Sequence, residues 1–239
     1  MSVVSSLKRL LPGGIKQRVR EYAGVPTMAG RMKNLAAAGF RCSGAIDGGA
    51  YAGDWASVCQ QIFSCPVLAV EPLPQAGLQK LVASQADIHL SEVALSAEVN
   101  QSVTFVQEET NSRFPDPQTL ATEGIGLTQV ATERLENLVP NLPFSPNLLK
   151  LDLQGAELKA LRGAESVLEQ FEVIICEVSI IPVGGVPEFC EVSDWLQARN
   201  YKLYDFLPAY YRPLDQALWQ ADAFFVQRSS ALVQSTQWQ

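Results

Sequence analysis

The sequence predicts one α/β domain with a mostly parallel β-sheet, helices on both faces and an antiparallel hairpin at its C-terminal end. Three observations predict this fold. Short apolar segments alternate with helical segments, an order typical of a parallel sheet that is covered on both faces. The last two apolar segments are joined by residues 208–221, a proline- and tyrosine-rich connection too short for a crossover helix of normal length. The length of 239 residues suits one such domain with short additions.

The elements are expected in a regular order. A helix over residues 28–38 ends at Gly39, because glycine commonly follows the last turn of a helix. The strands are expected at residues 44–49, 66–72, 86–95, 103–107, 148–153, 173–179, 201–207 and 222–228. Further helices are expected at residues 53–63, 74–84, 155–170 and 188–199. The first three strands and the pair after Leu148 fit two halves of one sheet, and ligands of such sheets bind where the halves meet.

Charge and turn content suggest the domain boundaries. Residues 1–41 carry eight basic residues and one acid, whereas the rest of the chain carries ten basic and twenty-four acidic residues. We therefore expect a basic helical extension over 1–40, a main domain over 41–230 and a tail over 231–239. Residues 108–147 are rich in turn formers and are expected to be an insertion between the two halves.

Composition limits the partners and the compartment. An acidic main domain argues against a nucleic-acid partner, and the basic extension is either a solvated helix, which we favour, or a contact to an anionic surface. No apolar run reaches the about 18 residues that a transmembrane segment needs. Five cysteines without a CxxC pair, together with a single histidine, favour reduced thiols in the cytoplasm and no metal site. The oligomeric state is not predicted.

A glycine-rich turn over residues 46–53 ends the first strand and opens a helix. Interpreted as a dinucleotide motif, GxGxxG, it has Ala50 where the pyrophosphate must come closest, which weakens that interpretation. Interpreted as DxGxxxG, it places Asp47 before the turn, where a carboxylate favours a cationic ligand and repels a pyrophosphate. The ligand contacts expected from this turn are Asp47, Gly48, Gly49, Ala50, Tyr51, Gly53 and Asp54.

The second strand ends in an acid that fits an adenosine ligand. Glu71, followed by Pro72, comes 24 residues after Asp47, and an acid at this place can accept hydrogen bonds from both ribose hydroxyls. NAD-dependent enzymes also have an acid there, so Glu71 indicates an adenosine without identifying the cofactor.

The segment LLKLDLQGAELKALRGAESVL, residues 148–168, combines a buried strand with an amphipathic helix. Asp152, Gln154 and Glu157 lie at the joint, where packing alone does not require polar groups. Asp152 and Glu177 are acids at the ends of neighbouring strands, on the edge where ligands bind. Glu157 is either a site residue or an acid that stabilises its own helix, and Lys150 is expected to pair with a nearby acid.

This segment resembles the signature of the FkbM-type methyltransferases, (I/L)K-(I/L)D-x-Q-G-x-E followed by L-x-G-A. The matching residues are Lys150, Asp152, Gln154, Gly155, Glu157, Leu161, Gly163 and Ala164. Other similar segments keep the family's order between Arg31 and Arg228: MKNLAAAGF, IDGGAYAG, VEP, ALS, CEVS, YDF and DAFFV. The chain departs from the family at Tyr51, where asparagine is usual.

The resemblance implies a Rossmann-like class I methyltransferase sheet and S-adenosylmethionine as the cofactor. It implies an adenine pocket at Val93 and Ala94, and methyl transfer to a hydroxyl of a small molecule or glycan. Residues 108–147 would then shape the acceptor pocket. The candidate catalytic residues are Asp152, Glu177 and Glu157, of which Asp152 is also a cofactor contact. Two alternatives remain, an NAD-type oxidoreductase and a cofactor-binding protein that has lost its activity.

Overall fold

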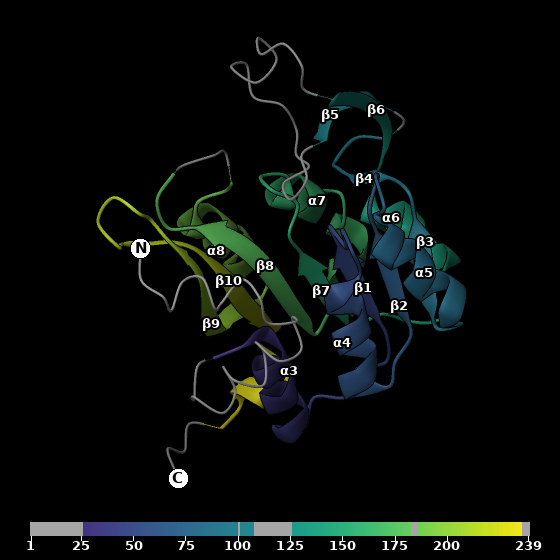
Figure 1. Ribbon diagram of the computed structural model, residues 1–239. Helices are drawn as coiled ribbons and strands as arrows, with labels where there is room; N and C mark the ends of the chain where they lie inside the picture. The colour runs from purple at the N-terminus through teal and green to yellow at the C-terminus, as the bar shows by residue number, and fades with distance from the viewer. Residues whose placement is uncertain (1–25, 100, 108–125, 183–185, 236–239) are drawn as a thin grey trace, which may run out of the picture.

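A computed structural model describes residues 26–99, 101–107, 126–182 and 186–235. Its main sheet has seven strands in the order β3-β2-β1-β7-β8-β10-β9 (Figure 1). Five parallel strands come first: β1 (Ala45–Gly48), β2 (Val67–Val70), β3 (Ile88–Ser91), β7 (Leu148–Leu151) and β8 (Val173–Ser179). They are followed by the antiparallel pair β9 (Tyr201–Tyr211) and β10 (Leu218–Gln227). The predicted parallel sheet with a C-terminal hairpin is therefore confirmed.

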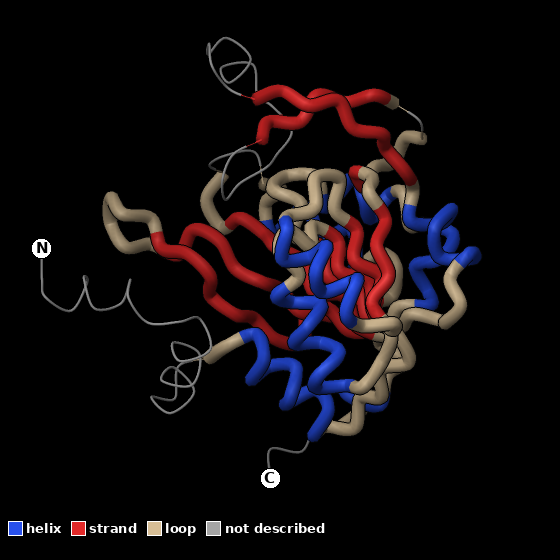
Figure 2. Tube along the Cα trace, turned by 45° about the vertical axis from the view of Figure 1, so that its right-hand side comes forward, coloured by secondary structure: helices blue, strands red, loops and turns tan. Residues whose placement is uncertain are grey.

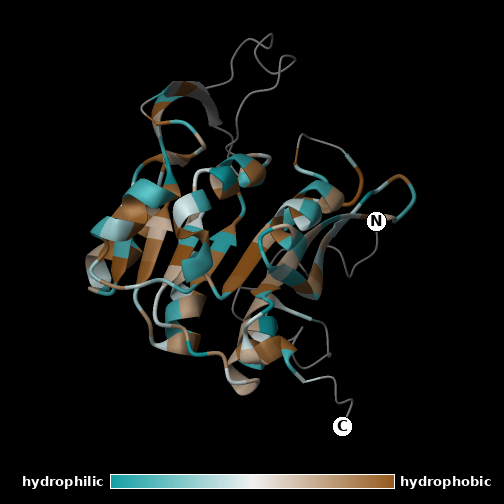
Figure 3. Cartoon of the chain, turned by 180° about the vertical axis from the view of Figure 1, so that it is seen from behind, coloured by the Kyte–Doolittle hydropathy of each residue, from teal (hydrophilic) through white to brown (hydrophobic). Residues whose placement is uncertain are grey.

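Helices cover both faces of this sheet because successive side chains of each buried strand point to opposite sides. In β8, Val173 and Ile175 pack with residues of two helices, α3 (Met28–Ala37) and α4 (Asp54–Phe63). Ile174 and Cys176 pack with residues of α7 (Glu157–Arg162) and α8 (Phe189–Gln197). Figure 2 shows helices in front of the strands, and from behind, in Figure 3, the strands between the helices are largely hydrophobic.

The order of the strands creates a switch point between β1 and β7. From β1 the chain proceeds outward through β2 to β3, with α5 (Ala76–Ser84) between these two strands, and it later returns to β7 on the other side of β1. Connections from β1 and β7 consequently leave the sheet in opposite directions at their carboxyl ends. This geometry opens a crevice at that edge in open α/β sheets.

A second sheet of three strands, in the order β4-β6-β5, corrects one strand prediction, confirms another and adds β6, which was not predicted. The predicted strand 86–95 divides into β3 and the separate β4 (Ala94–Leu95), which pairs with β6 (Gly126–Glu133). The strand predicted at 103–107 is β5 (Ser102–Gln107), which also pairs with β6. In β6, Val130 and Thr132 are buried while Gln129 and Ala131 are exposed, so the strand is half-buried, but the buried threonine and the exposed alanine conceal this alternation in the sequence.

The described part of the predicted insertion thus contains regular elements. After β6 come α6 (Leu135–Leu138) and the 3₁₀-helix η2 (Val139–Asn141). Residues 108–125 lie outside the described residues, as do residues 1–25 of the basic extension.

One helix prediction, and the assignment of another helix to the basic extension, need adjustment. The predicted helix 155–170 is divided at Gly163 into α7 and the 3₁₀-helix η3 (Glu165–Gln170), and a Cβ at Gly163 would lie 2.1 Å from the carbonyl oxygen of Ser96. Helix α3 belongs to the packed body although charge assigned it to the extension 1–40, since Met32 and Leu35 are buried against the sheet. The charge of this segment placed it in the extension, because net charge does not show that one face of a basic helix is apolar. The short η4 (Ala231–Val233) follows at the start of the predicted tail.

No helix in the described ranges is long and apolar enough to cross a membrane.

Candidate active site

The glycine turn after β1 uses its amide groups within the protein. The N–H groups of Gly49 and Ala50 both donate to the carbonyl oxygen of Val70 in β2, at 2.9 and 3.3 Å, and the N–H of Gly53 donates to Ala50. Gly49 and Gly53 have positive φ angles of 78° and 89°, and Tyr51 has one of 45°. The turn therefore has the left-handed conformations that glycine favours, but these amides do not form a cradle for a phosphate.

Glu71 ties the end of β2 to this turn. Its carboxylate accepts hydrogen bonds from the N–H of Tyr51 at 2.9 Å and from the N–H of Leu73 at 3.0 Å. Burial raises the pKa of Glu71. Each carboxylate oxygen accepts one of these bonds and keeps a further lone pair, which leaves capacity to accept from ribose hydroxyls.

The predicted adenine contacts lie beyond Glu71. Pro72 is partly buried directly after it, and Ala94 packs with Leu73 in a small apolar cluster. Val93 is partly buried against the main core. Asp54, the first residue of α4, is exposed at the end of the turn.

Asp47 lies beneath the turn rather than in the crevice. It is fully buried, and its Oδ1 is 3.0 Å from Nζ of Lys150, its neighbour across the β1–β7 pair. Burial of Asp47 raises its pKa. Burial alone would lower the pKa of Lys150, yet the carboxylates of Asp47 and Asp152 raise it, so the lysine stays charged. The expected pairing of Lys150 with a nearby acid is confirmed, and each charge of this pair offsets the other.

Three carboxyl groups form a row across neighbouring strands, which we call the acidic row: Asp152, Glu177 and Asp222. Glu177 in β8 and Asp222 in β10 are directly opposite each other, and Asp152 follows β7 at the same level. Nε2 of Gln154 donates to Asp152 at 2.9 Å and to Glu177 at 3.2 Å. Nζ of Lys150 lies 3.5 Å from Asp152, whose side chain is 34% exposed.

The members of the acidic row differ in protonation. Burial and then the charge of Asp152 raise the pKa of Glu177 to about 9, so this carboxyl is protonated at neutral pH. The same causes raise the pKa of Asp222 to about 6, which leaves it mostly ionised. The pKa of Tyr210 is raised by burial and by the row, so its phenol on β9 lies close enough to sense this charge.

Sequence reasoning brought Asp152 and Glu177 together correctly but missed Asp222. The available signal was a single acid inside the apolar strand LWQADAFFV. Buried acids are uncommon unless they have partners, so an acid in a core strand at the level of Glu177 points to a site.

The side chain of Glu157 stabilises the backbone that connects β7 to α7. It is fully buried and accepts hydrogen bonds from the N–H of Leu153 at 2.7 Å and from the N–H of Gly155 at 3.1 Å. Burial raises its pKa to about 7. Its contacts are those of a residue that shapes the 153–155 backbone, and they hold Gln154 where it bridges the acidic row.

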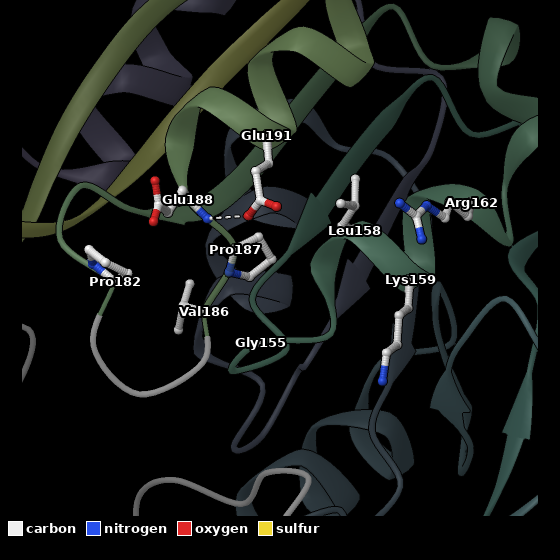
Figure 4. Close-up of a pocket in the computed structure, with 9 residues that line it drawn as sticks. All are labelled: Gly155, Leu158, Lys159, Arg162, Pro182, Val186, Pro187, Glu188 and Glu191. Carbon is white, nitrogen blue, oxygen red and sulfur yellow. Dashed lines mark hydrogen bonds between the residues drawn. The ribbon is translucent and has the colours of Figure 1, made fainter. Parts of the chain in front are cut away.

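A cavity of about 420 Å³ lies on the α7–α8 side of the same joint (Figure 4). Its wall includes Gly155 at the joint, Lys159 and Arg162 on α7, and Glu188 and Glu191 at the start of α8. The carboxylate of Glu191 accepts from the backbone N–H of Glu188 at 3.1 Å. Glu177 and Asp222 are each two residues from a core residue, Ile175 and Phe224, that packs on the α3–α4 face. The acidic row therefore lies on that face of the sheet, and the cavity lies on the other.

Among the described residues, no group of three or more histidine, cysteine or acidic side chains is arranged to hold a metal ion.

Comparison with known proteins identifies the family. The sequence matches the family Methyltransferase FkbM domain over residues 47–203, and it matches no curated protein. The fold is similar to that of a "putative rRNA-methylase" from Clostridium thermocellum, with a TM-score of 0.51, 9% identity, and coverage of 86% of this chain and 98% of that one.

Two further solved structures have lower scores. The 1,6-didemethyltoxoflavin-N1-methyltransferase of Burkholderia thailandensis, solved with S-adenosylhomocysteine, has a TM-score of 0.47, 8% identity, and coverage of 88% and 83%. The N-methyltransferase NodS of Bradyrhizobium japonicum has a TM-score of 0.47, 10% identity, and coverage of 83% and 93%. With the family match covering more than half of its length, the chain belongs to the FkbM methyltransferases and is an S-adenosylmethionine-dependent enzyme with a class I Rossmann-like fold.

Proposed function

We propose that this methyltransferase methylates a hydroxyl group of a small molecule or glycan, and that Asp152 accepts the hydroxyl proton. The observation that carries this proposal is the acidic row, which places the partly exposed carboxylate of Asp152 beside the buried Glu177 and the half-buried Asp222. An alcohol must lose its proton as its oxygen attacks the methyl carbon, so a carboxylate at the crevice is suited to the reaction.

The residues present fit S-adenosylmethionine better than a dinucleotide. The carboxylates of the row complement a ligand that carries an ammonium and a sulfonium group, and Lys150 is already paired with Asp47. The amides of Gly49 and Ala50 are occupied by Val70, so they are not available to a pyrophosphate, which the nearby carboxylates would also repel. These two features argue against the NAD-type oxidoreductase.

The bound cofactor supplies a methyl group on a positively charged sulfur. We assign its ribose hydroxyls to Glu71, its adenine to the surroundings of Pro72, Val93 and Ala94, and its charged end to the region of Asp152. The turn from Gly48 to Asp54 would cover it from the α4 side. In this assignment Asp47 acts through Lys150 and does not touch the cofactor.

The three carboxyl groups of the acidic row have different roles, because they differ in protonation and exposure. Glu177, with a pKa of about 9, holds its proton at neutral pH and can only donate or accept hydrogen bonds there. Asp222 is mostly ionised and adds a negative charge that favours a cationic cofactor. Asp152 has the exposure that an acceptor requires, and Gln154 orients it through the 2.9 Å hydrogen bond. Glu157 supports the joint and takes no part in proton transfer.

The negative charge of the crevice also favours a hydroxyl-bearing small molecule or glycan over a nucleic acid as the methyl acceptor. A row of carboxylates repels the phosphates of RNA or DNA, whereas it can accept hydrogen bonds from sugar or phenol hydroxyls. Five free cysteines fit a reducing compartment, so we place the protein in the cytoplasm.

A transfer assay with methyl-labelled S-adenosylmethionine tests this function. The panel contains phenols, hydroxylated polyketides, free and lipid-linked sugars, primary amines and an RNA oligonucleotide. We expect label in a methyl ether, and a fall of about 100-fold in kcat for Asp152→Asn with a much smaller change in cofactor affinity. Asp215→Asn, at an exposed turn of the hairpin, is the matched control and should turn over normally. Label found only in the amine or the RNA would refute the hydroxyl acceptor.

A further inference from the structure

Three cysteine sulfurs gather at the edge of the sheet opposite the crevice. Cys42 lies just before β1, Cys65 lies just before β2, and Cys59 is in the second half of α4. The sulfur of Cys65 is 3.4 Å from that of Cys42, and Cys59 packs in the same cluster of core residues. All three thiols are free, Cys42 is half-buried, and the other two are buried.

We propose that Cys42 and Cys65 form an oxidisable dithiol, which a peroxide converts into an intramolecular disulfide. The two residues precede the paired parallel strands β1 and β2, whose hydrogen bonds hold their backbones side by side. A disulfide bond is about 2.05 Å long, so the sulfurs need to approach by roughly 1.4 Å, a shift that side-chain rotation can provide. Neither residue contributes to the acidic row or to the glycine turn.

The environment gives the two sulfurs different parts in the reaction. Hydrogen bonding with Cys42 and then with Cys59 lowers the pKa of Cys65, which makes Cys65 the readier thiolate and the first sulfur to react with a peroxide. Hydrogen bonding with Cys59 acts to lower the pKa of Cys42, but its hydrogen bond with Cys65 and its burial raise it, so this more exposed thiol keeps its proton until the second step. Cys59 has a raised pKa because of its hydrogen bonds to the other two thiols, and it keeps its proton.

The chemistry balances in two steps. The thiolate of Cys65 attacks hydrogen peroxide, an S–O bond forms, the O–O bond breaks, and the released hydroxide takes up the proton that Cys65 had lost to become water. The sulfur of Cys42 then attacks the sulfur of Cys65. The S–S bond forms, the S–O bond breaks, and the leaving hydroxide takes up the proton that Cys42 releases. Two thiols and one peroxide thus give one disulfide and two water molecules.

The crosslink would enclose the segment that carries the cofactor turn. The loop from Cys42 to Cys65 contains β1, the turn of residues 48–53 and all of α4. The bond would lie at the amino ends of β1 and β2, whereas the turn and Glu71 lie at their carboxyl ends. The dithiol is therefore a modification site separate from the active site.

Peptide mapping of the full-length protein tests the proposal. Cys190→Ser first removes the exposed thiol, so that crosslinks between molecules do not interfere. The protein is treated with hydrogen peroxide, alkylated without reduction, digested and analysed by mass spectrometry. We expect a peptide pair joined through Cys42 and Cys65, lighter by two hydrogens and separated again by dithiothreitol.

Further variants make the outcome decisive. Cys59→Ser in the same background should still form the crosslink, whereas Cys42→Ser should abolish it while circular dichroism shows an intact fold. A crosslink through Cys59 would overturn the assigned pair. Full alkylation of Cys42 after peroxide treatment, with the fold intact, would overturn the dithiol itself.

Discussion

The carbonyl oxygen of Asp152 lies 1.9 Å from where a Cβ on residue 49 would be, so only glycine allows the turn to pack on the end of β7. The N–H of Asp152 also donates to the carbonyl of Gly48 at 3.0 Å. The cofactor turn and the proposed base are consequently held against each other by backbone contact. A change in one of them moves the other.

This contact predicts a large difference between two glycine substitutions. Gly49→Ala should lower the free energy of unfolding by about 3 kcal/mol or more and also weaken cofactor binding, because the methyl group displaces the backbone of Asp152. Gly39→Ala is the control, since its φ of 106° is equally left-handed but its Cβ would meet no atom within 4 Å. It should cost only about 1 kcal/mol, from backbone strain alone. Chemical denaturation and calorimetric titration measure both effects, and equal losses in the two variants would contradict the contact.

Glu71→Ala should weaken S-adenosylmethionine binding by about 10- to 100-fold, because hydrogen bonds to a charged acceptor are worth about 1.5–3 kcal/mol. The variant also loses the hydrogen bonds from Tyr51 in the turn and from Leu73 after β2, so its unfolding should be measured without ligand to separate the two contributions. Glu92→Ala, at an exposed acid just after β3, is the matched control. Unchanged affinity in a folded Glu71→Ala protein would remove this residue from the site.

Glu157→Ala should reduce stability rather than chemistry. It leaves the N–H groups of Leu153 and Gly155 without their acceptor, which should cost about 1–3 kcal/mol in denaturant titrations. The kcat per folded molecule should stay within a few-fold of the wild type. Glu165→Ala is the control. Glu165 is exposed at the start of η3 and pairs with Arg199, so its removal should change stability by less than about 1 kcal/mol. A loss of turnover of 100-fold without a loss of stability would return Glu157 to the candidate bases.

The raised pKa of Glu177 predicts that the free energy of unfolding falls as the pH rises. Its pKa is raised from 4.5 to about 9, so between these values the folded protein binds a proton that the unfolded chain has released. The unfolded state then holds fewer protons, and the free energy of unfolding decreases with pH across this window. Glu177→Gln is neutral throughout and should lose less stability between pH 6 and 9, by up to roughly 4 kcal/mol. Glu92→Gln should follow the wild-type curve, and a parallel curve for Glu177→Gln would show that Glu177 is ionised in the fold.

The sequence predicted the main sheet and much of the site because both depend on local patterns. Buried strands, glycine turns and acids at strand ends appear directly in the order of residues, as at Glu71 and Asp152. Asp222 was missed because its importance depends on the pairing of β10 with β8, a contact between distant parts of the chain. The second sheet was missed for the same reason, since the two residues of β4 are a strand only beside β6.

The role expected for Asp47 also required tertiary information. From the sequence it was an acid beside a ligand turn, and the DxGxxxG spacing says nothing about which way its side chain points. Its neighbour across β1 and β7 is Lys150, and the buried ion pair between them takes the carboxylate away from the crevice. The close approach of Gly163 to the carbonyl oxygen of Ser96 could not be predicted either, because it joins distant parts of the chain.

Calorimetric titration of the purified protein with S-adenosylmethionine and, separately, with NAD⁺ tests most directly whether the acidic crevice selects a cationic adenosine cofactor. The acidic row and the occupied amides of the turn predict S-adenosylmethionine binding that is at least about 100-fold tighter, a difference of about 2.7 kcal/mol. Asp215→Asn should reproduce the wild-type isotherms. NAD⁺ binding as tight as that of S-adenosylmethionine, or tighter, would contradict the account of this site.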